Sequence, residues 1–445
     1  MKIHRQCTTA VIGALVVTMA HQAGAAGFAV QEKSVAALGR AFAGNSLPGD
    51  DASSAFYNPA DMVNLEDRTM MQVGVTYVMT DINVEGTYSN SLLPVPISET
   101  GSGNSDEDVV IPNFSLVTPI SEFMSFGLSI NAPFGLATDY GEEWFSRYAT
   151  TLAELKVIDI NPSLSFKISD DFSVGFGLSY QYVEAELNQR IQRSALAASL
   201  FSNGTITSGQ IPSFISGTDG YSNLEGDDWS WGYNLGLTWS ITDNLVTSLA
   251  YRSEVHHKLD GDQVTSGYTA GGALAPTLNG SVGGEADLDL PQSVNISTMW
   301  TISEKWDVMA SAIWTGWSSF EELRVELDNG SVTTEEQNWR NVWAFAIGAA
   351  FKMSDTMDLR FGYQYDPTPI GDDDDRSARI PDTDRDFFTV GLGWHLSENM
   401  TIDAAYGYLL GESVDMMGET SQGDFDGEVK DSEAHLIGVQ FQYKM

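Results

Sequence analysis

The sequence almost lacks cysteine, which excludes disulfide bonds as a source of stability. The single residue of this type, Cys7, lies in an N-terminal segment with the form of a secretory signal peptide. Two basic residues precede an apolar core at residues 10–17, and Ala23-Gly24-Ala25 has the small-residue pattern of a cleavage site. We therefore predict that residues 1–25 are removed and that the mature chain begins at Ala26 without any cysteine.

Basic residues are also scarce. The chain has 22 Lys and Arg against 61 Asp and Glu, which gives a formal net charge of −39. A protein this acidic repels phosphate, so nucleic acid is excluded as a partner. Hydrophobic residues make up 42% of the chain, too many for a disordered acidic tail. With 42 glycines and 11% aromatic residues, the composition favours β structure over a helical bundle.

The mature sequence has no long hydrophobic run. No stretch reaches about 18 consecutive apolar residues, so we predict no transmembrane helix. Two classes remain after this exclusion. The first is a soluble secreted protein, and the second is a transmembrane β-barrel, whose strands alternate and therefore give no hydropathy peak.

Motifs of catalytic and metal sites are missing as well. The sequence contains no G-x-S-x-G, H-E-x-x-H or G-x-x-x-x-G-K-[ST] motif, so we predict no enzyme activity and no cofactor. His256 and His257 are neighbours in a predicted strand, where adjacent side chains face opposite ways, so they make a poor metal pair. The acidic run at residues 372–375 is interpreted as a solvated loop, with a Ca²⁺ or Mg²⁺ site as the alternative.

Alternation of large apolar residues with small or polar ones is the strongest positive signal. It runs through residues 172–182, 231–241 and 437–445. A period of two over 9–11 residues predicts strands that are long enough to cross a bilayer when tilted. One face is heavily aromatic and the other is small and neutral, which suits lipid outside and a polar lumen or plug inside.

A short motif recurs between the alternating runs and sets the predicted strand count. An apolar residue, Ser or Thr, and an acid occur together, a combination that favours tight turns. The six copies begin at Ile120, Ile168, Ile241, Ile302, Met353 and Leu396. The long connections fall near 81–108, 132–154, 190–227, 258–287, 318–337, 366–384 and 411–429. Six short turns and seven long loops require fourteen antiparallel strands, with the turns on the periplasmic side and the loops outside.

The first part of the mature chain does not fit this pattern. Residues 28–65 show no alternation and contain several Gly, Pro and Ala residues. A fourteen-stranded barrel is too wide for its own side chains to fill. We therefore predict an all-β, fourteen-stranded transmembrane barrel over residues 69–445, plugged by an N-terminal hatch over residues 26–68.

Several motifs, taken in order, resemble those of the outer-membrane long-chain fatty acid transporter family, which also includes aromatic-hydrocarbon channels. They cover essentially the whole mature chain: A-G-F at 26–28, L-G-R-A-F-A-G at 38–44, D-D-A at 50–52, N-P-A at 58–60, F-G-L-A-T at 134–138, W-S-W-G at 229–232, Y-R-S-E-V at 251–255, W-S-S-F at 317–320 and I-P-D-T-D-R at 380–385. The resemblance implies a hatch, a hydrophobic groove between outer loops, a tighter inner site, and sideways release through an inward kink in the third strand.

The resemblance also suggests residues that bind the ligand. Phe28 resembles the family's N-terminal phenylalanine that contacts ligand, and Arg324 stands where the family carries a pocket lysine. The other basic pocket position falls on Gln189, with Arg190 beside it. A buried carboxylate needs a cation. We therefore expect Phe28, Arg190 and Arg324 at the inner site, although both arginines could instead pair with local acids.

The hatch motif and the third strand suggest a further contact. Pro59 fixes its own φ and biases Asn58 to an extended conformation. A proline cannot donate to a strand ladder, so we expect a kink near Asn131 and Pro133. Asn58-Pro59-Ala60 is expected to fix the hatch to the wall, with the Asn58 amide bonding to backbone that this kink leaves unpaired. A simple entry turn into the first strand is the alternative.

The function expected from these signals is passive uptake of hydrophobic molecules across the outer membrane of a Gram-negative bacterium. Long-chain fatty acids are the default ligand, with lateral release into the membrane. Neutral hydrocarbons are the alternative, because the acidic chain repels a carboxylate. A general porin and an adhesin are further alternatives. We expect a monomer that contacts outer-membrane lipid and lipopolysaccharide.

Overall fold

The computed structural model describes residues 27–47, 51–65, 67–90, 97–105, 108–215, 217–268, 278–420 and 422–445. The predicted signal peptide and Ala26 lie outside these residues. The strands are β1 (Met70–Asn90), β2 (Ile97–Ser105), β3 (Asp108–Ser121), β4 (Met124–Asn131), β5 (Gly135–Asp139), β6 (Leu152–Lys167), β7 (Phe172–Ile191), β8 (Gly220–Thr242), β9 (Leu245–Arg252), β10 (Val255–Ser266), β11 (Gly280–Leu290), β12 (Ser293–Ser303), β13 (Trp306–Thr315), β14 (Glu322–Leu327), β15 (Val332–Glu336), β16 (Val342–Ser354), β17 (Met357–Asp366), β18 (Arg385–Ser397), β19 (Met400–Gly411), β20 (Val414–Thr420) and β21 (Gly423–Lys444).

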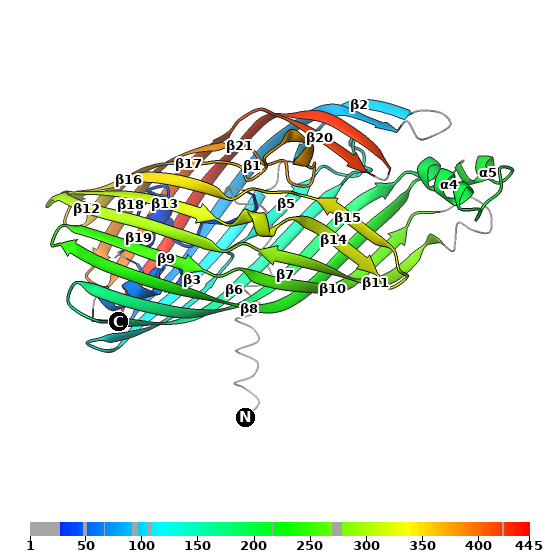
Figure 1. Cartoon of the computed structure of the whole chain (residues 1–445). Helices are drawn as coiled ribbons and strands as arrows, with labels where there is room; N and C mark the ends of the chain where they lie inside the picture. The colour runs from blue at the N-terminus through cyan, green and yellow to red at the C-terminus, as the bar shows by residue number, and fades with distance from the viewer. Residues whose placement is uncertain are drawn as a thin grey trace.

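These strands form one antiparallel sheet that closes into a barrel (Figure 1). The closure is the pairing of β1 with β21, which runs from Met70 opposite Lys444 to Ser89 opposite Asp424. Seven of the barrel strands are interrupted once, so the 21 segments make up fourteen strands: the interrupted pairs are β2–β3, β4–β5, β9–β10, β11–β12, β13–β14, β15–β16 and β19–β20. The predicted fold, a fourteen-stranded antiparallel barrel, is confirmed.

The six predicted turns all join neighbouring strands. Each copy of the motif lies where a strand ends, at the ends of β3, β6, β8, β12, β16 and β18, and the next strand follows within four residues. The long connections lie at the other end of the barrel, where α4 (Arg193–Ser202) and α5 (Ile211–Ile215) project beyond the wall (Figure 1). The Ser, Thr and acidic residues of the motif therefore predicted the positions of these turns correctly.

The alternation determines which side chains face outward. Along β8, Trp231, which is 64% exposed, and Tyr233 face outward, whereas Gly232 and Asn234 are buried on the inner face. An outer surface of large apolar side chains is stable against lipid, and a small polar inner surface leaves room for the hatch. None of the described helices is both long and apolar enough to cross a bilayer.

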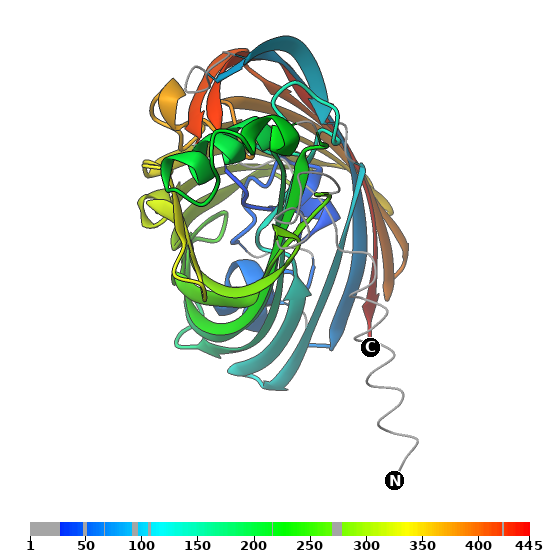
Figure 2. The ribbon, with the colours of Figure 1, turned by 90° about the vertical axis from the view of Figure 1, so that its right-hand side faces the viewer.

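The hatch lies within the lumen (Figure 2). It contains two short helices, α2 (Val35–Leu38) and α3 (Ser54–Tyr57), and the 3₁₀ helix η1 (Pro59–Asn64), whose side chains are mostly buried. The Ser34 hydroxyl accepts a hydrogen bond from the Ala37 N–H, which caps the start of α2. Two further 3₁₀ helices of the described residues, η3 (Trp317–Ser319) and η4 (Asp373–Asp375), lie in the connections of the barrel.

Glycines in the wall let the hatch backbone approach closely. A side chain at Gly362 would overlap the backbone of Arg40, and one at Gly391 would lie 2.7 Å from the Cα of Gly39. Only glycine permits this approach of two backbones. The hatch is therefore packed against the wall directly, and the first strand begins at Met70.

Candidate functional site

An apolar cavity lies inside the barrel, above the hatch and towards the long loops. It encloses about 840 Å³, including solvent at its mouth. Most of its lining is aliphatic or aromatic, with Arg379 as its basic side chain and three glutamates and one glutamine as further polar residues. Side chains of β6, β7, β8, β10, β11 and β14 supply the wall: they include Leu155, Leu187, Leu224, Leu259, Leu288 and Val325.

The cavity forms because the alternation is inverted in this part of the barrel. In β10, Val255 and Leu259 are buried on the inner face, whereas His256 and Lys258 are exposed outside. β11 and β14 repeat this arrangement, with Leu288 and Val325 inward between exposed or partly exposed acidic and basic residues. Apolar residues therefore face the lumen here, while charged residues face outward above the lipid-facing band.

Phe28 forms the centre of an aromatic cluster at one end of the cavity. Its side chain is 2% exposed, and its ring centroid lies 4.7 Å from that of Trp317 and 5.4 Å from that of Phe320. Phe134 and Trp339 complete the cluster, at 6.0 Å and 5.6 Å. Edge-to-face contacts of this kind add to the stability gained by burial. Phe28 thus forms part of the cavity wall.

The third barrel strand breaks beside this cluster. β4 ends at Asn131 and β5 begins at Gly135, so the interruption contains Pro133. Within the described residues no ladder joins β5 to β2 or β3, which leaves a gap in the hydrogen-bond ladder between the second and third barrel strands. The hatch covers the gap from inside, because Val30 N donates to Pro133 O and Gly135 N donates to Phe28 O, each over 2.9 Å.

Arg379 places its guanidinium at the cavity. It is largely buried, its Nε donates to Glu335 Oε2 over 3.0 Å, and its Nη2 donates to Gln189 Oε1 over 3.0 Å. Its Nη1 is buried and has no hydrogen-bond acceptor among the residues described. Sequence reasoning missed this residue because it lies in a loop without periodicity. The available signal was its position directly before the I-P-D-T-D-R motif.

The two arginines expected at the site lie elsewhere. Arg324 is 46% exposed and pairs with Glu326 over 2.6 Å, because it alternates with the inward-facing Leu323 and Val325 and so faces outward. Arg190 pairs with Glu142 over 3.3 Å and does not line the cavity. The expectation that these arginines lie at the inner site is therefore wrong. The Gln189 position is nevertheless close to a cation, since Gln189 accepts its hydrogen bond from Arg379.

The hatch motif contacts a different strand from the one expected. The side-chain amide of Asn58 donates to Ser46 O over 2.7 Å and to Thr238 Oγ1 over 2.9 Å, and its Oδ1 accepts from Ala60 N over 3.1 Å. Thr238 belongs to β8, the sixth barrel strand, so the expected bond to the third-strand kink is wrong. The motif is fixed to the wall through β8, and Pro59 is the first residue of η1.

Charged residues of the hatch are buried next to one another. Burial lowers the pKa of Lys33 to about 7, while the neighbouring Glu32 carboxylate acts in the opposite direction. Burial raises the pKa of Glu32, and Lys33 opposes that change. The Lys33 ammonium also lies 5.2 Å from the centre of the Phe56 ring. The pair therefore adds little net charge to the hatch interior.

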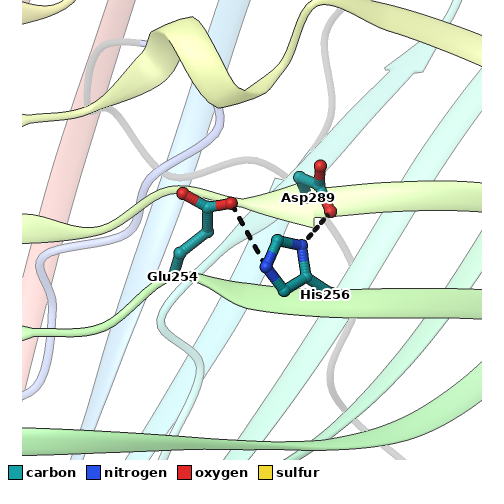
Figure 3. A group of neighbouring side chains, drawn as sticks. All are labelled: Glu254, His256 and Asp289. Carbon is teal, nitrogen blue, oxygen red and sulfur yellow. Dashed lines mark hydrogen bonds and ion pairs between the residues drawn. The ribbon is translucent and has the colours of Figure 1, made fainter.

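The two adjacent histidines face opposite ways, as predicted. The His257 ring is buried and its Nδ1 lies 3.0 Å from Asp228 Oδ2. His256 is 73% exposed, with Nδ1 2.7 Å from Asp289 Oδ1 and Nε2 3.5 Å from Glu254 Oε1 (Figure 3). Both ring nitrogens of His256 thus face carboxylates, and the contacts join β10 to β11.

The acidic run at residues 372–375 forms part of an ordinary loop contact. Three of its residues make up η4, and Asp373 pairs with Arg376 over 2.6 Å. Arg376 also donates from Nη1 to Asp415 O over 2.6 Å, which ties the run to the neighbouring connection. Asn338 holds the run as well, since its Nδ2 donates to Asp375 Oδ1 over 3.2 Å.

A closed barrel with an apolar outer surface, an N-terminal plug and an apolar cavity in its lumen defines an outer-membrane transport protein. The chain belongs to the family described as Outer membrane protein transport protein (OMPP1/FadL/TodX), whose family model matches residues 16–445. It is therefore an outer-membrane β-barrel of a transport family and not an enzyme.

Relatives of the chain cover nearly all of it. The long-chain fatty acid transport protein of Escherichia coli O6:H1 is 28% identical, over 98% of each chain. Outer membrane protein P1 of Haemophilus influenzae is 27% identical, over 88% of this chain and 87% of its own. The crystal structure of a Pseudomonas aeruginosa FadL homologue superposes with a TM-score of 0.83 at 28% identity, over 94% of this chain and 99% of the other. The Pseudomonas putida toluene transporter TodX, at 18% identity and a TM-score of 0.65 over 91% and 98%, shares the fold.

Proposed function

We propose that this protein is a passive channel that takes up long-chain fatty acids and releases them sideways into the outer membrane. The observation that carries the proposal is the apolar cavity with the Arg379 guanidinium at its lining. Similar proteins in Escherichia coli are named long-chain fatty acid transport proteins, which supports the same ligand class.

The cavity matches the two ends of a fatty acid. Each methylene group that leaves water for the apolar lining contributes about 0.8 kcal/mol. A carboxylate loses its hydration in the same step, and this cost is offset only by a charged hydrogen-bond donor. Arg379 Nη1 is such a donor, buried and without an acceptor among the residues described. The acyl chain would lie along Leu155, Leu187 and Leu259, with its head group at Arg379.

Release is coupled to Phe28 in this proposal. A ligand that displaces the Phe28 side chain also pulls on the backbone of residues 28–30. The Phe28 carbonyl accepts a hydrogen bond from Gly135, and the Val30 N–H donates one to Pro133. Loss of these two bonds uncovers the gap between the second and third barrel strands. The apolar ligand then has a route from the cavity to the hydrocarbon region without crossing the polar loops.

Neutral hydrocarbons are the second candidate. The observation in their favour is that Arg379, the basic residue of the cavity lining, already pairs with Glu335 over 3.0 Å, which partly neutralises its charge. Most of the remaining lining described is aliphatic or aromatic and offers an anion no other cation. A general porin is disfavoured, because the hatch occupies the lumen (Figure 2).

Uptake by intact cells distinguishes the two ligands. Cells that lack their own fatty acid channel and express this protein should take up labelled oleate faster than cells without it. Arg379→Gln should reduce oleate uptake by roughly tenfold or more, the effect of losing one charge-assisted hydrogen bond. Uptake of labelled hexadecane should be unchanged by the substitution. Equal rates for oleate in the two sets of cells, with faster uptake of hexadecane or toluene, would overturn the fatty acid proposal and favour the hydrocarbons.

A further inference from the structure

A second cavity lies in the opposite half of the lumen. It encloses about 490 Å³ and is bounded by β1, β18, β19 and β21, whereas the apolar cavity lies against β5 to β14. Its lining is mixed, with the polar groups of Asp382, Thr383, Arg385 and Ser432 beside aliphatic side chains such as Ile82 and Leu409.

The N-terminal residues and one loop separate the two cavities. Phe28 lines the apolar cavity, and its neighbour Gly27 lines the second one. Ile380 lines both. The Gly27 N–H donates to Asp382 Oδ2 over 3.0 Å, so the start of the hatch is tied to the same loop. Gly27, Phe28 and Ile380 therefore form the partition between the two cavities.

The second cavity contains a buried arginine whose Nε and Nη2 make no hydrogen bond among the described residues. The Arg385 side chain is 9% exposed. Neither its Nε nor its Nη2 has a hydrogen-bond acceptor within the described part of the chain. Asp382 Oδ1 lies 3.2 Å from Nη2 and balances the charge, but it does not lie in hydrogen-bonding geometry. The Nε and Nη2 edge of a guanidinium is the one that grips a carboxylate with two parallel bonds.

Asp382 uses its two carboxylate oxygens differently: Oδ1 forms the ion pair with Arg385, and Oδ2 takes the hydrogen bonds. Its Oδ2 accepts from Gly27 N and also from Thr368 Oγ1, over 2.6 Å. Asp366, the next acidic group, lies 3.9 Å from Arg385 Nη2. A buried donor edge without an acceptor costs free energy, which an incoming carboxylate would recover.

We propose that Arg385 forms a second carboxylate site, which receives the head group of the fatty acid after it has passed the Gly27–Phe28 partition. The inference rests on the proposed fatty acid function. Arg379 and Arg385 lie on either side of Ile380 and face different cavities. An anion that moves from the first arginine to the second stays paired with a cation while it is out of water, which avoids the high cost of an isolated buried charge.

The test compares oleate with oleyl alcohol, which has the same chain and no charge. Arg385→Gln should lower the rate of oleate uptake by cells about tenfold and leave oleyl alcohol uptake unchanged. Purified Arg385→Gln protein should still bind oleate within about twofold of wild type, because Arg379 is intact. Arg340→Gln is the matched control, since Arg340 is an exposed arginine that lines neither cavity.

Two results would overturn the inference. Arg385→Gln cells that take up oleate at the rate of Arg340→Gln cells would show that the carboxylate does not use Arg385. Equal loss of oleate and oleyl alcohol uptake would show that Arg385 only supports the structure. If the Arg385→Gln barrel does not fold, as judged by heat-dependent migration on a gel, Arg385→Lys takes its place. It keeps the charge without the paired edge and should slow oleate alone. Wild-type cells that take up no oleate would instead refute the proposed function.

Discussion

Replacing Gly236 by alanine should loosen the hatch without touching the lipid-facing surface. Gly236 lies on the inner face of β8, and a methyl group there would overlap Asn58 Oδ1 and lie 3.0 Å from Ala60 N. Asn58 makes its hydrogen bonds to Ser46 O and Thr238 Oγ1 at this point. The added methyl group therefore competes for space with the side chain that fixes the hatch to the wall.

The size of the effect follows from the packing. Forcing an extra methyl group into a closely packed contact costs about 1–3 kcal/mol. We call the hatch seated when Asn58 contacts β8. The added methyl group raises the free energy of this seated state alone, because a barrel whose hatch has moved away has space at Gly236. The equilibrium between seated and unseated hatch should then shift by roughly 5- to 150-fold.

Conductance in planar lipid bilayers measures this shift. Purified Gly236→Ala protein should spend a larger fraction of time in an ion-conducting state than the wild type. Gly418→Ala is the matched control, because an added methyl group at Gly418 in β20 meets no atom within 4 Å. The same open fraction for Gly236→Ala, Gly418→Ala and wild type would refute the conclusion that Asn58 seats the hatch through β8.

Three further predictions concern the hatch, the topology and the release route. Deleting residues 27–60 should leave a folded barrel with a permanently open pore, and a closed barrel would place the plug elsewhere. A cysteine at Thr207 should react with an impermeant thiol reagent on intact cells and one at Asp170 should not, whereas the reverse pattern would invert the topology. Ala29 and Phe134 pair as an isolated bridge, so a disulfide between cysteines at these positions should block oleate uptake until it is reduced. Equal rates of oleate uptake with the disulfide formed and with it reduced would exclude release at the third strand.

The barrel could be predicted because its determinants are local. Period-two alternation sets the strands, and Ser, Thr and acidic residues set the turns. The break of the third strand at Pro133 also has a local cause, since proline lacks the N–H that a ladder needs.

The candidate site could be predicted only in part. In β14, Leu323 and Val325 lie on one face of the strand and Arg324 on the other. The alternation shows this separation, but it does not show which of the two faces points into the lumen. The inversion above the lipid-facing band is a property of the folded barrel. Arg379 lies in a loop and Arg385 is the first residue of β18. The contacts of Arg379 with Glu335 and Gln189, and of Arg385 with Asp382, depend on the tertiary fold. The same is true of Asn58, whose partner strand depends on the path of the hatch.

Calorimetric titration of purified protein with oleate and with oleyl alcohol tests the central claim most directly. The wild type should bind oleate more tightly than the alcohol, and Arg379→Gln should weaken oleate binding about 10- to 150-fold while it leaves the alcohol within about twofold. This result would place a carboxylate at Arg379 in the apolar cavity. Equal affinities for the two ligands in the wild type, unchanged by Arg379→Gln, would contradict the account and identify the cavity as a site for neutral molecules.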